Sequence, residues 1–190
     1  MKNVCYFLFL LLNCILFMSA CVPKYLPVPT KSVEISGEFG IITLGNTTLA
    51  TTEAIWGREP QYLPDYYLTL YVRIKNGGVE SLPINPIDFA IIDENDIQFD
   101  IINYDVVLEL MLQHPSLIPE RFTIANEGIR DNLARRNEIR MNIINNAFTF
   151  GEIHKGSIKE GILYFPKLSN NNKEFTLVYK DNEIKFKKTK

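Results

Sequence analysis

The sequence predicts a mainly β protein, an antiparallel sandwich that carries an α-helical insertion. Short runs of β-branched and aromatic residues, separated by turn formers, recur in both halves of the chain. In the stretch Tyr66–Lys75, the aliphatic residues alternate with polar or aromatic ones, as in a strand with one buried face. Only the segment at about 104–148 has the period of about 3.6 residues that is typical of a helix. Strands that do not alternate with helices favour an antiparallel sandwich.

Residues 1–20 are predicted to be a signal peptide. Lys2 gives a positive start, and Val4–Phe17 is an almost unbroken apolar run. This run is shorter than the roughly 20 residues that a transmembrane helix needs. The next residues, Met18-Ser19-Ala20-Cys21, resemble the lipobox of bacterial lipoprotein precursors. The resemblance implies cleavage between Ala20 and Cys21 and a covalent lipid on the Cys21 thiol. An uncleaved N-terminal anchor is the alternative interpretation.

The expected anchor limits the compartment and the chemistry of the protein. Lys2 is the only charged residue among the first 20, so its removal changes the formal net charge from −2 to −3 and argues against nucleic-acid binding. Cys5 and Cys14 lie in the signal peptide. Once Cys21 is lipidated, the remaining chain has no thiol for a disulfide, a cysteine zinc site or a cysteine nucleophile. The resemblance further implies an extracytoplasmic location, and Val22 in place of an aspartate favours the outer membrane if the cell is Gram-negative.

The part after the lipobox is expected to be a short tether followed by one domain. Residues 21–32 are rich in proline and predict an extended tether. Residues 33–190 are close to the usual length of a single domain. The first strands are expected at 33–35, 41–44 and 47–55, because glycines separate these runs.

Further strands are expected as hairpins. Residues 87–92 and 97–102 flank a polar tip at Asp93–Asp96, and residues 174–179 and 183–187 flank Lys180–Asn182. The run 157–165 predicts another strand, which Pro166 closes.

The insertion, from Tyr104 to about Phe148, is expected to contain two helices. Asn103 is a plausible N-cap, and Pro115 ends the first helix. The second helix is expected from Thr123 to Phe148. Its apolar side, at about 100° per residue, is Ala125, Ile129, Leu133, Ile139, Ile143, Ile144 and Ala147.

Two arginines and two tyrosines are candidate contact residues. Arg136 and Arg140 project into the middle of the apolar arc, where burial would desolvate two cations. The alternatives are a break or kink near Asn137, or stems that lie on the core with their guanidinium heads in water. Pairing with acidic residues of the sandwich and an anion-binding pocket are the other two. Tyr67 and Tyr71 lie on the second face of the strongest strand. They are core residues if the insertion covers that face, and an exposed aromatic patch for a partner if it does not.

Parts of the β sequence also resemble a known class of domain. The matching stretches are Lys75–Gly78, Ile87–Phe89 with the turn that leads to Phe99, and Gly156–Gly161 before Phe165. They resemble the immunoglobulin-like, telokin-like domains of unknown function that occur in bacterial lipoproteins. The resemblance implies an immunoglobulin-like sandwich that acts as a binding or spacer module without catalytic residues. The helical insertion departs from the short connection of a typical member.

The sequence offers no clear set of metal-binding or catalytic residues. His114 and His154 lie in different contexts, and the turn at Asp93 lacks the ligand and glycine positions of a calcium loop. No phosphate-binding loop or nucleophile elbow is present. We therefore expect no metal and no cofactor other than the lipid on Cys21.

Together these features predict a lipid-anchored, extracytoplasmic binding or assembly module of the bacterial envelope that is not an enzyme. An envelope protein is the expected partner, with the insertion as its contact surface. The alternative is a small-ligand carrier or enzyme whose site lies between insertion and sandwich and uses Arg136, Arg140 or His154. A third possibility is a passive spacer.

Overall fold

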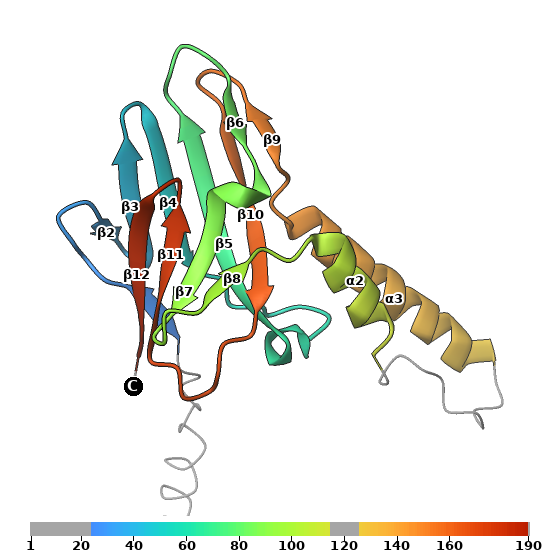
Figure 1. Ribbon diagram of the computed structural model, residues 1–190. Coiled ribbons are helices and arrows are strands. Elements are labelled where there is room, and N and C mark those ends of the chain that lie inside the picture. Colours follow the sequence, from blue (N-terminus) through green and yellow to red (C-terminus); the bar gives the residue numbers. More distant parts are fainter. Residues whose placement is uncertain (1–23, 115–125, 190) are drawn as a thin grey trace, which may run out of the picture.

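Two five-stranded antiparallel sheets face each other in the computed structural model, which describes residues 24–114 and 126–189 (Figure 1). One sheet has the order β1-β12-β11-β7-β8, the other has the order β10-β5-β4-β3-β2, and β6 pairs with β9 beside them. The strands are β1 (Tyr25–Pro27), β2 (Glu34–Ser36), β3 (Phe39–Leu44), β4 (Thr47–Glu53), β5 (Tyr67–Asn76), β6 (Leu82–Ile84), β7 (Phe89–Asp93), β8 (Gln98–Asp100), β9 (Gly151–Ile153), β10 (Ile158–Pro166), β11 (Glu174–Tyr179) and β12 (Asn182–Lys188).

The helices α2 (Tyr104–Leu112) and α3 (Asn126–Asn146) lie between β8 and β9 in the chain and extend to one side of the sheets (Figure 1). There are two single-turn 3₁₀ helices in the described part: η1 (Leu63–Asp65) precedes β5, and η2 (Pro86–Asp88) precedes β7. The predicted fold class, a mainly β antiparallel sandwich with a helical insertion at about 104–148, is confirmed. In the described ranges, no helix has both the length and the apolar character needed to span a membrane.

The main core lies between the two large sheets. The aliphatic residues of β5 from Leu68 to Ile74 are buried there, as their alternation predicts. Phe89 and Ile91 of β7 contribute to the same core from the opposite sheet, as do residues of β11 and β12. Burial of each such side chain stabilises the fold by roughly 1.5–3 kcal/mol, so this layer supplies most of the apolar driving force.

A second core lies on the outer face of β5 and β10, under the helical insertion. Val107 and Met111 of α2 pack there with Ile139 and Ile143 of α3. Strand β10 is consequently buried on both faces, and its run from Gly161 to Phe165 is buried without interruption. The insertion is therefore a structural layer of the domain, and not an appendage.

The N-terminal end differs from the prediction. A free tether was expected over residues 21–32, yet Tyr25–Pro27 form β1, which pairs with Phe186–Lys188 of β12. The Tyr25 ring is buried, and its hydroxyl donates a hydrogen bond of 2.8 Å to the Asn172 carbonyl oxygen. The tether prediction is wrong from Tyr25 onward because β1 is an edge strand, where proline is tolerated. The signal peptide, Ala20 and Cys21 lie outside the described residues.

The long helix also differs in one respect. Helix α3 continues without a break from Asn126 to Asn146, so the alternative of a break near Asn137 is wrong. Ile139, Ile143 and Ala147 are buried as expected, but Leu133 is 61% exposed and Ile144 is 39% exposed. Ala125 and the side chain of Ile129 lie outside the described part. The apolar side that packs on the sandwich is thus narrower than the helical pattern predicts.

Candidate binding cleft beside the first strand

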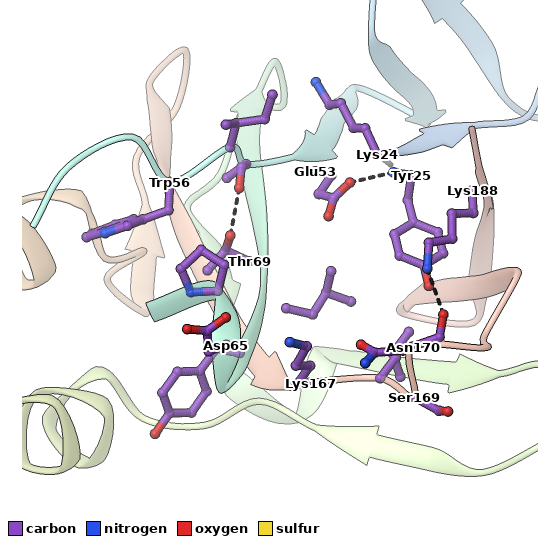
Figure 2. A pocket seen from close by; sticks show the side chains of 16 residues that line it. Lys24, Tyr25, Glu53, Trp56, Asp65, Thr69, Lys167, Ser169, Asn170 and Lys188 are labelled. Atoms are coloured by element: carbon purple, nitrogen blue, oxygen red, sulfur yellow. Dashed lines mark hydrogen bonds between the residues drawn. The ribbon is translucent and has the colours of Figure 1, made fainter. Parts of the chain in front are cut away.

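A cavity of about 460 Å³ lies where β1, the end of β4, η1 and the chain after β10 meet (Figure 2). Lys24 precedes β1, Glu53 ends β4, and Lys167 follows β10 directly. Each of these positions is a strand end, where the chain leaves the sheet and its side chains are no longer fixed by the alternation of the strand. Strands from both large sheets therefore contribute to one cavity.

Glu53 is the half-buried carboxylate of the cleft. Its Oε2 accepts a hydrogen bond of 2.5 Å from the backbone N–H of Tyr25. Among the described residues, none donates a hydrogen bond to Oε1. Burial raises the pKa of Glu53 above its ordinary value of 4.5, although that hydrogen bond and the charges of Lys24 and Lys188 act in the opposite direction. The carboxylate thus has unused acceptor capacity in a partly desolvated place.

Three lysines line the cleft together with this carboxylate. In Figure 2, Lys24 and Lys188 lie near Glu53, and Lys167 lies across the cavity. Lys24 Nζ pairs with Glu38 at 2.5 Å, and Lys188 Nζ donates to the Asn170 carbonyl oxygen at 2.8 Å. An ammonium has three protons, so both groups keep donors for a ligand.

The remaining wall is largely apolar. Trp56 and Tyr67 contribute aromatic surface, and Leu68 and Leu168 contribute aliphatic surface. Trp56 is the only tryptophan of the chain, and its ring is covered by the Arg58 guanidinium at 5.6 Å from the ring centroid. A cleft with one apolar wall and several charged groups is typical of small-ligand sites, where the polar groups orient the ligand.

A second cavity, of about 450 Å³, lies beside the first and shares Lys24, Glu53, Ala54 and Ile55 with it. It continues toward Arg58 and Glu160. Ile55 lines both cavities and is 77% exposed. Two adjoining cavities therefore share the surface around Glu53.

The two predicted arginines are not part of this cleft. Arg136 Nη1 donates to the Leu112 carbonyl oxygen at 3.0 Å, which places its charge at the C-terminal end of α2. That end carries the negative pole of the helix dipole, and this explains how a cation is accommodated near the core. Arg140 is exposed and makes no hydrogen bond or ion pair within the described part of the chain. The cation that pairs with an acidic residue of the sandwich is Arg135, whose Nη2 lies 3.2 Å from Glu59 Oε2.

The two predicted tyrosines lie under the insertion or at its edge. Tyr67 is buried in the second core and also lines the cleft. Tyr71 is partly buried and packs edge to face on Phe39, with 6.0 Å between the two ring centroids. Burial, with the nearby Glu160 carboxylate, raises the pKa of Tyr71 to about 12. These positions fit the core interpretation, and not an exposed aromatic patch.

The histidines lie far apart in the fold. His114 stacks on Tyr62 with 3.8 Å between ring centroids, whereas His154 Nδ1 lies 3.3 Å from Ser81 Oγ on the surface. Neither His154 nor Ser81 lines the cleft, the second cavity beside it or the cavity at the junction with the insertion. Within residues 24–114 and 126–189, no group of three or more histidine, cysteine, aspartate or glutamate side chains is placed to hold a metal ion.

The space between insertion and sandwich differs from the site that the carrier or enzyme alternative requires. Most of it is filled by the second core. A cavity of about 300 Å³ remains at the junction, between residues such as Ile102, Tyr104, Phe148 and Phe150, and no charged residue lines it. Arg136, Arg140 and His154 do not converge there.

Sequence reasoning missed the cleft around Glu53, because its residues come from strand ends that are distant in the chain. The one local signal is a glutamate that ends the β-branched run of β4, next to the apolar Ala54-Ile55-Trp56. Comparison of the chain with protein-family models, curated proteins and solved structures finds no match.

Proposed function

We propose that this protein is a lipid-anchored binding module of the bacterial envelope, attached through Cys21 outside the cytoplasm, and that it is not an enzyme. Its binding site is the cleft around Glu53. In a Gram-negative cell, its place is the outer membrane.

The observation that supports this proposal most is the position of the cleft relative to the lipobox. Lys24 lines the cleft and is three residues from Cys21. Three residues span at most about 11 Å when fully extended. Because β1 begins at Tyr25 and is paired with β12, only three residues separate Cys21 from this strand. A lipid on Cys21 therefore holds the cleft close to the membrane surface.

The decisive experiment compares the wild-type protein with Cys21→Ser in a bacterial host. The wild type should be recovered in membranes, with an acylated Cys21 in its N-terminal peptide by mass spectrometry. Cys21→Ser should lack the acyl groups. A wild-type chain that is processed at another residue, or a Cys21 that carries no acyl chain, would refute the anchor.

A second candidate is an envelope protein that binds the outer side of α3. Leu133, Met141 and Ile144 are exposed apolar residues, and at about 100° per residue they lie on one side of the helix. Site-specific crosslinkers at Leu133 and Ile144 would give the same discrete adduct in envelopes if this side binds a protein. Crosslinkers at the exposed Glu138 serve as the control.

A further inference from the structure

The charges that line the cleft are of both signs. Glu53 and Asp65 contribute carboxylates, and Lys24, Lys167 and Lys188 contribute ammonium groups. A purely anionic ligand would meet the half-buried Glu53, and a purely cationic ligand would meet the lysines. A molecule that carries both charges can pair with each set, so a zwitterion has the best electrostatic fit.

Glu53 defines what the positive group must be. Its Oε1 accepts no hydrogen bond from the described residues, while Oε2 is occupied by the Tyr25 N–H. A partly buried carboxylate is stabilised by a charged donor, and such hydrogen bonds are stronger than those between neutral groups. A primary ammonium supplies both the charge and the protons.

The lysines define the negative group. Lys188 Nζ uses one proton on the Asn170 carbonyl oxygen, and Lys167 Nζ makes no hydrogen bond within the described part of the chain. Both residues line the same cavity, and an ammonium binds a phosphate as a point charge, without the planar geometry of a guanidinium. The apolar surface of Leu68 and Leu168 leaves room for a small carbon skeleton next to these groups.

We infer that the cleft binds a primary ammonium and a phosphate on one molecule, which is the chemistry of a phosphoethanolamine headgroup. The choice of a membrane lipid as its source rests on the proposed function, since the lipid on Cys21 would hold the cleft within reach of such headgroups. Glu53 receives the ammonium, and Lys167 and Lys188 receive the phosphate.

The test uses the full-length processed protein in an uncharged detergent and the fluorescence of Trp56, the only tryptophan, which lines the cleft. Glycerophosphoethanolamine should produce a saturable change, and glycerophosphoglycerol, which lacks the amine, should bind roughly tenfold or more weakly. Equal binding of the two ligands, or no saturable change, would overturn the inference without recourse to any variant.

Variants then assign the two charges. Glu53→Gln keeps an acceptor for the Tyr25 N–H and should remove the preference for glycerophosphoethanolamine. The double variant Lys167→Met/Lys188→Met should weaken the binding of both glycerophosphoethanolamine and glycerophosphoglycerol. Glu152→Gln in β9 and Lys155→Met in the turn before β10 are the matched controls; both residues are exposed, and both variants should bind as the wild type does. A Glu53→Gln protein with unchanged preference would contradict the assignment.

Vesicles separate the two sources of the ligand. In vesicles of phosphatidylethanolamine and phosphatidylglycerol, Trp56 emission should already be shifted relative to phosphatidylglycerol alone, and soluble ligand should add little. An unshifted spectrum that responds to soluble ligand would overturn the lipid source. Because the titration in detergent does not depend on acylation, a missing lipid on Cys21 would leave that result intact and would refute only the proposed anchor.

Discussion

Gly161 of β10 lies directly against the backbone of Phe148, where the insertion rejoins the sandwich. A Cβ at Gly161 would lie 2.5 Å from the Phe148 Cα and 2.6 Å from its nitrogen. The Phe148 N–H donates to the Ile162 carbonyl oxygen at 2.9 Å, so the contact is fixed by a hydrogen bond between backbones. Only glycine permits this approach, and the position of α3 depends on it.

Gly161→Ala is therefore expected to destabilise the protein by about 1–3 kcal/mol or more, because backbone atoms must move to make room for the methyl group. Urea unfolding measures the change. Gly57→Ala is the matched control, since nothing lies within 4 Å of a Cβ there. Equal stability of the two variants would show that β10 and Phe148 are not in contact.

Ile139→Ala and Ile143→Ala test whether the insertion is part of the folded unit. Both side chains are fully buried in the second core, so each truncation should cost about 2–5 kcal/mol. Leu133→Ala, on the exposed side of the same helix, should change stability by roughly 0.5 kcal/mol or less. Similar values for all three would mean that α3 does not pack on β5 and β10. Deletion of the whole insertion is expected to prevent stable folding, because Tyr67 and Tyr164 would lose their cover.

The stability contributed by Glu53 should depend on pH. Burial raises its pKa in the folded protein above 4.5, so the folded chain binds this proton more tightly than the unfolded chain does. The free energy of unfolding then falls as the pH rises through the folded pKa. Glu53→Gln cannot titrate, so its stability relative to the wild type should increase with pH over that window. Urea unfolding between about pH 4 and pH 8 measures the difference. A constant difference would contradict the raised pKa.

Substitution of Arg136 and substitution of Arg140 should change the stability by different amounts, although the two arginines have similar sequence contexts. Arg136→Met loses the hydrogen bond to the Leu112 carbonyl oxygen and should cost about 1 kcal/mol or more. Arg140→Met should change stability by roughly 0.5 kcal/mol or less, because the side chain is exposed. Thermal unfolding of both variants at low and high salt measures the effect. Equal losses would show that the contact with α2 does not form.

Local patterns predicted most of the strands. The alternation in β5 identified its buried face, and the pairing of β11 with β12 follows from a tight turn at Lys180 and Asp181, which have φ values of 45° and 64°. Strand β1 was missed because a run of three residues that includes a proline carries no periodic signal. Its formation depends on an edge that β12 provides from the other end of the chain.

The candidate site was less predictable than the fold. Helical periodicity placed Arg136 on the apolar side but could not show that the end of α2 would lie within hydrogen-bond distance. The sequence left Tyr67 either as a core residue or as part of an exposed aromatic patch. Only the position of the helices, which cover Tyr67, decides between these two interpretations. The cleft combines Glu53 with Lys167 and Lys188, more than 100 residues away, through sheet order. Sheet order depends on long-range pairing, which a single sequence does not specify.

The pairing of β1 with β12 also determines how the molecule would respond to mechanical force. The Thr189 N–H donates to the Lys24 carbonyl oxygen at 2.7 Å, and the Val28 N–H donates to the Lys185 carbonyl oxygen at 2.8 Å, so hydrogen bonds bracket the strand at both ends. Tension on a lipid at Cys21, along the axis of β1, would load these bonds in shear and together. The C-terminal strand β12 would then resist the extraction of β1 from the fold under load, although it lies at the opposite end of the chain from the anchor.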